Sequence, residues 1–115
     1  MGTTADFSGY WTGSLSGTNH GGFVVGLVQE GNNVTGTAKI NEPELGVYEY
    51  SVAGSVSGTY LELSMTPSRN DKGLQLGIVT VAVELDLNSM MNGNWKSSIG
   101  TVGILRAERI IDEIE

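Results

Sequence analysis

Few side chains in this chain are suited to catalysis or to metal binding. The 115 residues include a single histidine, His20 in the segment GTNHGG, and no cysteine. A general base needs a partner and a pocket, a zinc site takes three or four ligands, and haem needs an axial ligand. One histidine in a loop lacks the partner and pocket of a general base and cannot complete a zinc site, and it is the sole imidazole available to a haem, so we expect no metal and no cofactor. Binding is favoured over catalysis, although an isomerase or cyclase using a few polar groups in a cavity stays an open alternative.

The charge of the chain limits its partners. It has 13 acidic and six basic residues, and its formal net charge is −7. Because phosphate recognition begins with a basic patch, neither nucleic acid nor an anionic membrane surface is an expected partner. No apolar run approaches the roughly 20 residues that span a bilayer. The opening MGTTADF does not have the pattern of a signal peptide, and localisation stays open between the cytoplasm and export.

Four acidic residues stand at alternating positions that should face solvent. Such a stripe is typical of a solvated face that maintains solubility. The alternatives are a docking face for a basic partner or a weak calcium site. The residues are Glu49, Glu62, Glu84 and Asp86.

Polar aromatic and amide side chains are the best candidates for ligand contacts. They stand at positions where alternation directs a side chain toward the interior. Rings can stack on a ligand, and hydroxyl and amide groups can orient it. The alternative is that these groups hydrogen-bond to one another in a packed core. The candidate ligand-binding residues are Gln29, Tyr48, Tyr50, Met91 and Trp95.

Eight short segments with strand-like alternation must position these side chains. Glycine is abundant, with 17 residues, and turn sequences such as EGNN and NEPELG separate the segments. Most turns are short enough for hairpins, so consecutive strands should be antiparallel neighbours. The predicted strands cover residues 7–15, 22–30, 33–40, 47–56, 59–65, 76–87, 90–97 and 101–107.

Each predicted strand has one apolar face, and no helix lies between the strands to cover it. Closing the sheet buries every inner face and removes both edges. We therefore predict an all-β fold, an eight-stranded antiparallel up-and-down (meander) β-barrel, as a single domain over residues 1–107. Such a barrel has an interior that side chains just fill, or one that holds a single small ligand.

The barrel is expected to close between its first and last strands. Trp11 stands between two glycines in GYWTG, which leave room for its ring. We expect Trp11 and Arg106 to point inward on adjacent strands, where a shielded guanidinium over an indole contributes about 1–2 kcal/mol.

Two segments resemble the calycin group, the avidin and lipocalin families. GYWTG is similar to the Gly-x-Trp opening of those barrels, and NGNWKSSIGTVGILR is similar to their closing hairpin, with a tryptophan on the penultimate strand and an arginine ending the last. The resemblance implies a meander barrel, often with a pocket at its open end. It transfers no biotin-contact residue to this chain.

An apolar outer face and the C-terminal tail suggest a second surface. Outward-pointing apolar residues on the last, first and second strands should form a patch that a partner could cover. In the tail ERIIDEIE (108–115), three isoleucines share one helical face, which predicts a short C-terminal helix. That helix would pack on the patch, or both would meet another subunit. The interface candidates are Tyr10, Val24, Val28, Leu105, Ile110, Ile111 and Ile114.

The leading functional hypothesis is a non-catalytic protein that holds a small molecule in the barrel mouth. The alternative is a protein-interaction or oligomerisation module, inhibitor-like or part of a multidomain protein, with a filled barrel. The first hypothesis predicts a cavity bordered by the candidate residues. The second predicts a homo-oligomer or a complex with a protein partner.

Overall fold

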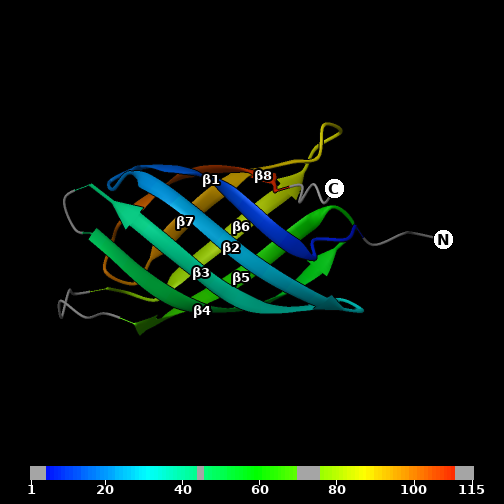
Figure 1. Cartoon of the computed structure of the whole chain (residues 1–115), viewed down its shortest axis with the longest axis horizontal. Coiled ribbons are helices and arrows are strands. Elements are labelled where there is room, and N and C mark those ends of the chain that lie inside the picture. The colour runs from blue at the N-terminus through cyan, green and yellow to red at the C-terminus, as the bar shows by residue number, and fades with distance from the viewer. Residues whose placement is uncertain (1–4, 44–45, 70–75, 111–115) are drawn as a thin grey trace, which may run out of the picture.

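The fold is a closed barrel of eight strands, each antiparallel to the next (Figure 1). The computed structural model describes residues 5–43, 46–69 and 76–110. Strand β1 pairs with both β2 and β8, so the sheet has no free edge. The strands are β1 (Gly9–Gly17), β2 (Gly21–Glu30), β3 (Asn33–Glu42), β4 (Gly46–Ser57), β5 (Tyr60–Arg69), β6 (Val79–Leu85), β7 (Met90–Ser97) and β8 (Val102–Arg109).

The predicted all-β meander barrel is confirmed, but the predicted C-terminal helix is not. Glu108 and Arg109 belong to β8, and Ile110 follows the strand and donates its backbone N–H to the carbonyl of Tyr10 at 2.8 Å. The rest of the predicted helix, which includes Ile111 and Ile114, lies outside the described residues. Within the described ranges, no helix is long and apolar enough to cross a membrane.

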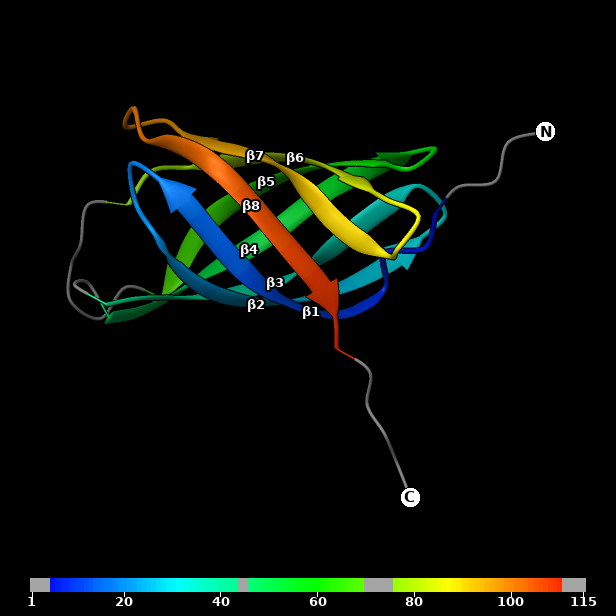
Figure 2. The same ribbon diagram turned by 90° about the horizontal axis from the view of Figure 1, so that it is seen from above.

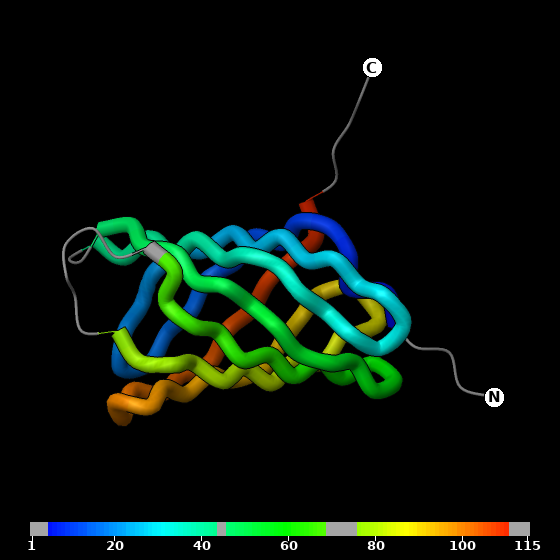
Figure 3. Tube along the Cα trace, turned by 90° about the horizontal axis from the view of Figure 1, so that it is seen from below, coloured from blue at the N-terminus to red at the C-terminus, as the bar shows by residue number. Residues whose placement is uncertain are grey.

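Alternation along the strands builds the core. Successive side chains of a strand point to opposite faces, so every second residue enters the barrel. Strands β1 to β7 follow the predicted inward positions, except that Leu87, predicted inward in the segment 76–87, lies beyond the end of β6 and is exposed. Neighbouring strands wind around the barrel at a slant, as the view from below shows (Figure 3). The most deeply buried large side chains are Trp11, Phe7, Leu61 and Val34.

The inward positions predicted for the last strand are wrong by one residue. Directly paired residues of antiparallel strands share a face, and inward Trp11 and Leu15 of β1 pair with Arg109 and Leu105 of β8. Leu105 therefore points inward, whereas Arg106 is exposed. The alternation in this strand is misleading because the inward position beside the Trp95 ring is a glycine, Gly103, while the outward positions next to it are apolar. A Cβ on Gly103 would lie 2.7 Å from the Trp95 ring.

One end of the barrel is closed by the N-terminal segment and by Arg109. The Arg109 guanidinium lies over the Trp11 ring at 4.5 Å from its centroid and donates to the backbone carbonyls of Ser8 and Asp6. The predicted contact between an arginine and Trp11 is thus present, with Arg109 in the place predicted for Arg106. Figure 2 shows β1 and β8 side by side at this closure.

Gly13 permits the close approach of β1 and β8 next to Trp11. A Cβ on Gly13 would lie 1.9 Å from the backbone carbonyl of Arg106, so no larger residue fits there without moving the strand. Gly9 has a φ of +115°, a backbone conformation that other residues rarely adopt. Trp11 is buried completely between these positions.

Candidate functional site

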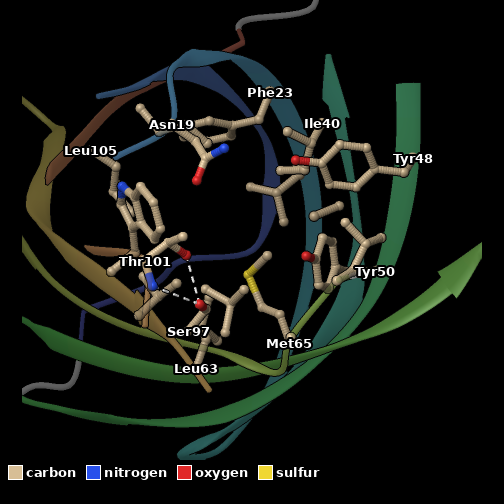
Figure 4. Close-up of a pocket in the computed structure, with 18 of the residues that line it drawn as sticks. Asn19, Phe23, Ile40, Tyr48, Tyr50, Leu63, Met65, Ser97, Thr101 and Leu105 are labelled. Atoms are coloured by element: carbon tan, nitrogen blue, oxygen red, sulfur yellow. Dashed lines mark hydrogen bonds between the residues drawn. The ribbon is translucent and has the colours of Figure 1, made fainter. Parts of the chain in front are cut away.

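The barrel contains a cavity at the end opposite to Trp11. Its volume is about 160 Å³. Apolar side chains from several strands form most of the wall (Figure 4), among them Val25, Ile40, Leu63, Met65, Val79 and Val81. A concave, mainly apolar site with a few convergent polar groups is the usual form of a small-molecule site.

Four of the five predicted ligand-binding residues line this cavity. Tyr48, Tyr50, Met91 and Trp95 all border it. Tyr48 and Tyr50 stand together on one wall, with ring centroids 5.8 Å apart and planes at 63°. Both hydroxyl groups point into the cavity in Figure 4.

Gln29 lies at the closed end and does not line the cavity. Its side-chain carbonyl accepts the backbone N–H of Phe7 at 2.8 Å, and its amide donates to the carbonyl of Ala5 at 2.9 Å. Gln29 therefore fixes the N-terminal segment across the closed end. Its inward position was predicted correctly, but inward alternation does not say which end of a barrel a residue occupies.

A buried carboxylate lies at the rim of the cavity. Glu42, the last residue of β3, is 6% exposed and is the one buried charged side chain among the described residues. Its carboxylate accepts a hydrogen bond from the Tyr48 hydroxyl and another from the Asn19 amide, whose nitrogen lies 3.3 Å away. Asn19 is on the turn between β1 and β2, so three segments meet at this group.

Tyr50 offers a hydroxyl to the cavity. The Tyr50 side chain is buried and lines the cavity, and its hydroxyl points into the cavity in Figure 4. Burial raises the pKa of Tyr50, and the negative charge of Glu42 raises it further. Tyr50 accordingly keeps its proton at neutral pH.

A second hydroxyl donor comes from the turn between β7 and β8. The Ser97 hydroxyl oxygen accepts the backbone N–H groups of Ile99 and Thr101, at 3.3 and 3.2 Å, and lies 2.6 Å from the Thr101 hydroxyl. A hydroxyl has two acceptor positions and one proton. Since both acceptor positions of Ser97 are used, its proton goes to Thr101. The Thr101 proton is then available to the cavity that both residues line.

Trp95 is held in place by the closing hairpin. Its indole N–H donates to the carbonyl of Ile104 at 3.2 Å, and its ring lies against Gly103. Because its one donor is already used, Trp95 can offer a ligand only its ring surface.

Several lining residues were not predicted as site residues. Glu42 has the same inward alternation as Ile40, so extending the predicted strand 33–40 by two residues would have identified it. Leu105 was assigned to the outer face because of the shifted alternation in β8. Ser97 has the same inward alternation as Trp95 in the predicted strand 90–97. Thr101 was assigned to the outer face by the same shift as Leu105. Asn19 lies in a turn, where alternation gives no direction for a side chain.

The predicted interface residues are divided by the structure. Tyr10, Val24 and Val28 are exposed on the outer face of β1 and β2, with 64% of Tyr10 and 60% of Val28 exposed. Ile110 is also exposed, next to Tyr10, whereas Leu105 lines the cavity. We call the exposed residues Tyr10, Val24, Val28 and Ile110 the outer patch.

The remaining candidates face solvent. His20 is exposed in its turn, as are Glu62, Glu84 and Asp86, while Glu49 is half-buried on the outer face. Asp86 accepts the backbone N–H groups of Asn88 and Met90 at 2.8 and 3.0 Å, and these bonds lower the pKa of its carboxyl. In the described parts of the chain, no three His, Cys, Asp or Glu residues lie together as a metal site would require.

The sequence matches no protein-family model, and no curated protein is significantly similar to it. Arguments about function therefore depend on the geometry of the barrel and its cavity.

Proposed function

We propose that this protein binds a compact, largely apolar small molecule inside the barrel, without catalysing a reaction on it. The observation that carries the proposal is the cavity of about 160 Å³, with apolar walls and a few polar groups that converge on it. A dry apolar cavity of about 150 Å³ is large enough to hold benzene. The ligand should therefore contain roughly one ring or an equivalent volume.

The distribution of polar groups supports binding with a defined orientation. Hydroxyl groups of Tyr50 and Thr101 face the cavity from different walls (Figure 4). Glu42, the last residue of β3, also lines the cavity. The apolar walls supply affinity through burial of ligand surface, about 25 cal/mol per Å². The polar groups select among molecules of similar size. Each polar group that loses its water when the ligand binds needs a hydrogen-bond partner on the ligand, and a ligand without that partner binds more weakly.

Binding is favoured over acid–base catalysis by the state of the polar groups. Tyr48 and Asn19 are engaged with Glu42, and Ser97 is engaged with its own turn. The exposed His20 does not line the cavity. This arrangement is typical of groups that position a ligand.

We also propose that the chain is a calycin-type barrel. The closed eight-stranded meander, the buried Trp11 after a Gly-x-Trp opening and the arginine over its ring support this relationship. The arginine is Arg109, three residues beyond the position suggested by the motif.

Native mass spectrometry of freshly purified protein tests the binding proposal. We expect an additional mass of a few hundred daltons or less, which is lost when the same sample is denatured. A discrete ligand would then be identified by its mass. An oligomer without any adduct would shift the balance to the second candidate function.

That second candidate is a protein-interaction or oligomerisation module acting through the outer patch. Exposed apolar side chains that adjoin one another often mark an interaction site, and Tyr10 and Val28 are more than half exposed. Sedimentation velocity over a range of concentrations tests it. If the patch joins subunits, Val28→Lys should yield monomers, whereas Val47→Lys, at another exposed apolar site on β4, should not.

A further inference from the structure

We infer that the cavity recognises a neutral molecule that carries a hydrogen-bond acceptor, such as an ether or carbonyl oxygen, on each of two opposite sides of a small apolar core. This inference rests on the proposed function, because it names the chemical class of the ligand held in the barrel. It assigns to the hydroxyl groups of Tyr50 and Thr101 the role of specificity-determining donors that contact the ligand.

The turn between β7 and β8 fixes the direction of one hydroxyl proton. The Ser97 oxygen accepts the backbone N–H groups of Ile99 and Thr101, so the Ser97 proton is directed to the Thr101 hydroxyl oxygen, 2.6 Å away. The Thr101 hydroxyl therefore accepts a hydrogen bond within the turn and keeps its own proton for another partner. Its oxygen faces the interior of the cavity in Figure 4. The turn thus presents a donor to a ligand.

Tyr50 presents a second donor, from the wall that β4 forms. Its side chain is buried and lines the cavity, and its hydroxyl points into the cavity on the side away from Thr101 (Figure 4). Burial raises the pKa of this hydroxyl, so the proton is retained at neutral pH. Tyr50 is therefore an uncharged donor.

Two further donors on the described wall are already used inside the protein. The Tyr48 hydroxyl donates to the carboxylate of Glu42, and the Trp95 indole N–H donates to a backbone carbonyl at 3.2 Å. Tyr50 and Thr101 are both neutral, so they suit an uncharged acceptor. A carboxylate would lose its hydration and gain only neutral partners from them.

The remaining surface of the cavity requires an apolar core between the two acceptors. Leu63, Met65 and Val81 belong to the wall, and the volume of about 160 Å³ holds roughly one ring. A hydrocarbon of the same shape would leave the hydroxyl protons of Tyr50 and Thr101 without a partner once water has left, which lowers its affinity. A molecule with an acceptor on each side pairs both protons.

Isothermal titration calorimetry with two probes of the same shape tests the inference. The diether 1,4-dimethoxybenzene has an oxygen on each side of its ring, and the hydrocarbon 1,4-diethylbenzene has methylene groups in the same places. Because the two probes also differ in hydration, the informative quantity is the change in the affinity of each probe on mutation. We expect Tyr50→Phe and Thr101→Val each to bind the diether at least about fivefold more weakly than the wild type does. Both variants should bind the hydrocarbon at least as tightly as the wild type.

Tyr60→Phe and Thr80→Val are the matched control variants. They remove the same hydroxyl groups from exposed positions on the outer faces of β5 and β6. Both should bind each probe as the wild type does, and an equal loss of diether affinity in these controls would contradict recognition inside the cavity. Circular dichroism and the melting temperature verify that all four variants are folded.

The possible outcomes separate the inference from the proposed function, with 2-phenylethanol as an independent probe of the cavity. If 2-phenylethanol binds the wild type and the diether does not, the inferred ligand class is wrong while a binding cavity stands. The same conclusion follows if Tyr50→Phe and Thr101→Val change the affinities of the diether and the hydrocarbon equally. If only one of these variants separates the two probes, recognition on two sides is contradicted. If neither 2-phenylethanol nor either matched probe binds the wild type, both the inference and the cavity proposal are contradicted.

Discussion

At the residue scale, the closed end depends on one guanidinium. Arg109 stacks on Trp11 and holds two backbone carbonyls of the N-terminal segment. Hydrogen bonds from a charged donor contribute about 1.5–3 kcal/mol each, and exposure reduces that value. Arg109 thus joins the last strand, the first strand and the chain that precedes it.

We predict that Arg109→Gln lowers the free energy of unfolding by about 2 kcal/mol, because both the ring contact and the carbonyl contacts are lost. Urea denaturation followed by tryptophan fluorescence measures the change. Arg106→Gln is the control, since Arg106 is exposed on the same strand and its loss should cost less than about 0.5 kcal/mol. Equal effects of the two substitutions would contradict the assignment.

Tyr50 gives a prediction about alkaline pH. A tyrosine in an unfolded chain ionises near pH 10, while burial and the charge of Glu42 raise the pKa of Tyr50 in the folded protein. Above about pH 10 the unfolded chain loses this proton and the folded chain retains it, so stability falls as pH rises through the folded-state pKa. Below that range the contribution of the protonated hydroxyl is fully present.

Denaturation at pH 8 and at pH 11 therefore distinguishes Tyr50→Phe from the wild type. The variant should lose less stability between the two pH values, because it has no proton to lose at this site. Tyr60→Phe, on the outer face of β5, should lose as much as the wild type. An alkaline loss in Tyr50→Phe equal to that of the wild type would show that Tyr50 is not responsible.

Alternation along the strands predicted which candidate site residues point into the barrel, but not which of them lie at the cavity. The cavity is lined by inward-pointing residues of β4 and β7 that lie at its level along the barrel axis. They are Tyr48, Tyr50, Met91 and Trp95. Gln29 has the same inward character but lies at the other end, because it comes just before the turn between β2 and β3, whereas Tyr48 follows the turn between β3 and β4. Successive turns of a meander lie at opposite ends of the barrel, and alternation alone does not distinguish them.

At the element scale, strand glycines allow the barrel to curve. At Gly36, in the middle of β3, an added Cβ would lie 1.9 Å from the backbone carbonyl of Gly26 on β2. A methyl group there must move one strand away from the other, which weakens the ladder between them.

Gly36→Ala should accordingly lower the free energy of unfolding by about 1–3 kcal/mol, the range for overpacking in a core. Gly22→Ala is the matched control on β2, because the nearest atom to its added Cβ would be 3.7 Å away. Thermal melting of the two variants measures the difference. A Gly36→Ala variant as stable as Gly22→Ala would contradict the close approach of β2 and β3.

The last strand shows why alternation alone can mislead. Val102 and Ile104 are apolar and exposed, whereas Gly103 is small and faces the Trp95 ring. The inner face of β8 is determined by pairing with β1 and by the volume of a side chain on β7. Both are tertiary constraints, so a pattern within residues 101–107 could not reveal them.

At the scale of the whole molecule, the two ends of the barrel have different roles. Phe7, Trp11 and Arg109 fill the closed end, while the opposite end keeps a cavity beside Glu42. The number of strands and their meander order were predictable from eight alternating segments joined by short turns. Whether the interior is filled or hollow was not predictable, because it depends on how side chains from all eight strands meet.

The central claim is that this cavity binds a small molecule, and substitution of Ala38 tests it most directly. Ala38 is buried and lines the cavity, so Ala38→Leu should fill part of its volume. Ala53→Leu adds the same carbons on the exposed face of the neighbouring strand β4. Calorimetric titration with 2-phenylethanol compares both folded variants with the wild type. We predict that the wild type and Ala53→Leu bind alike and that Ala38→Leu binds at least about tenfold more weakly; equal affinity in all three proteins, or no binding to the wild type, would contradict the claim.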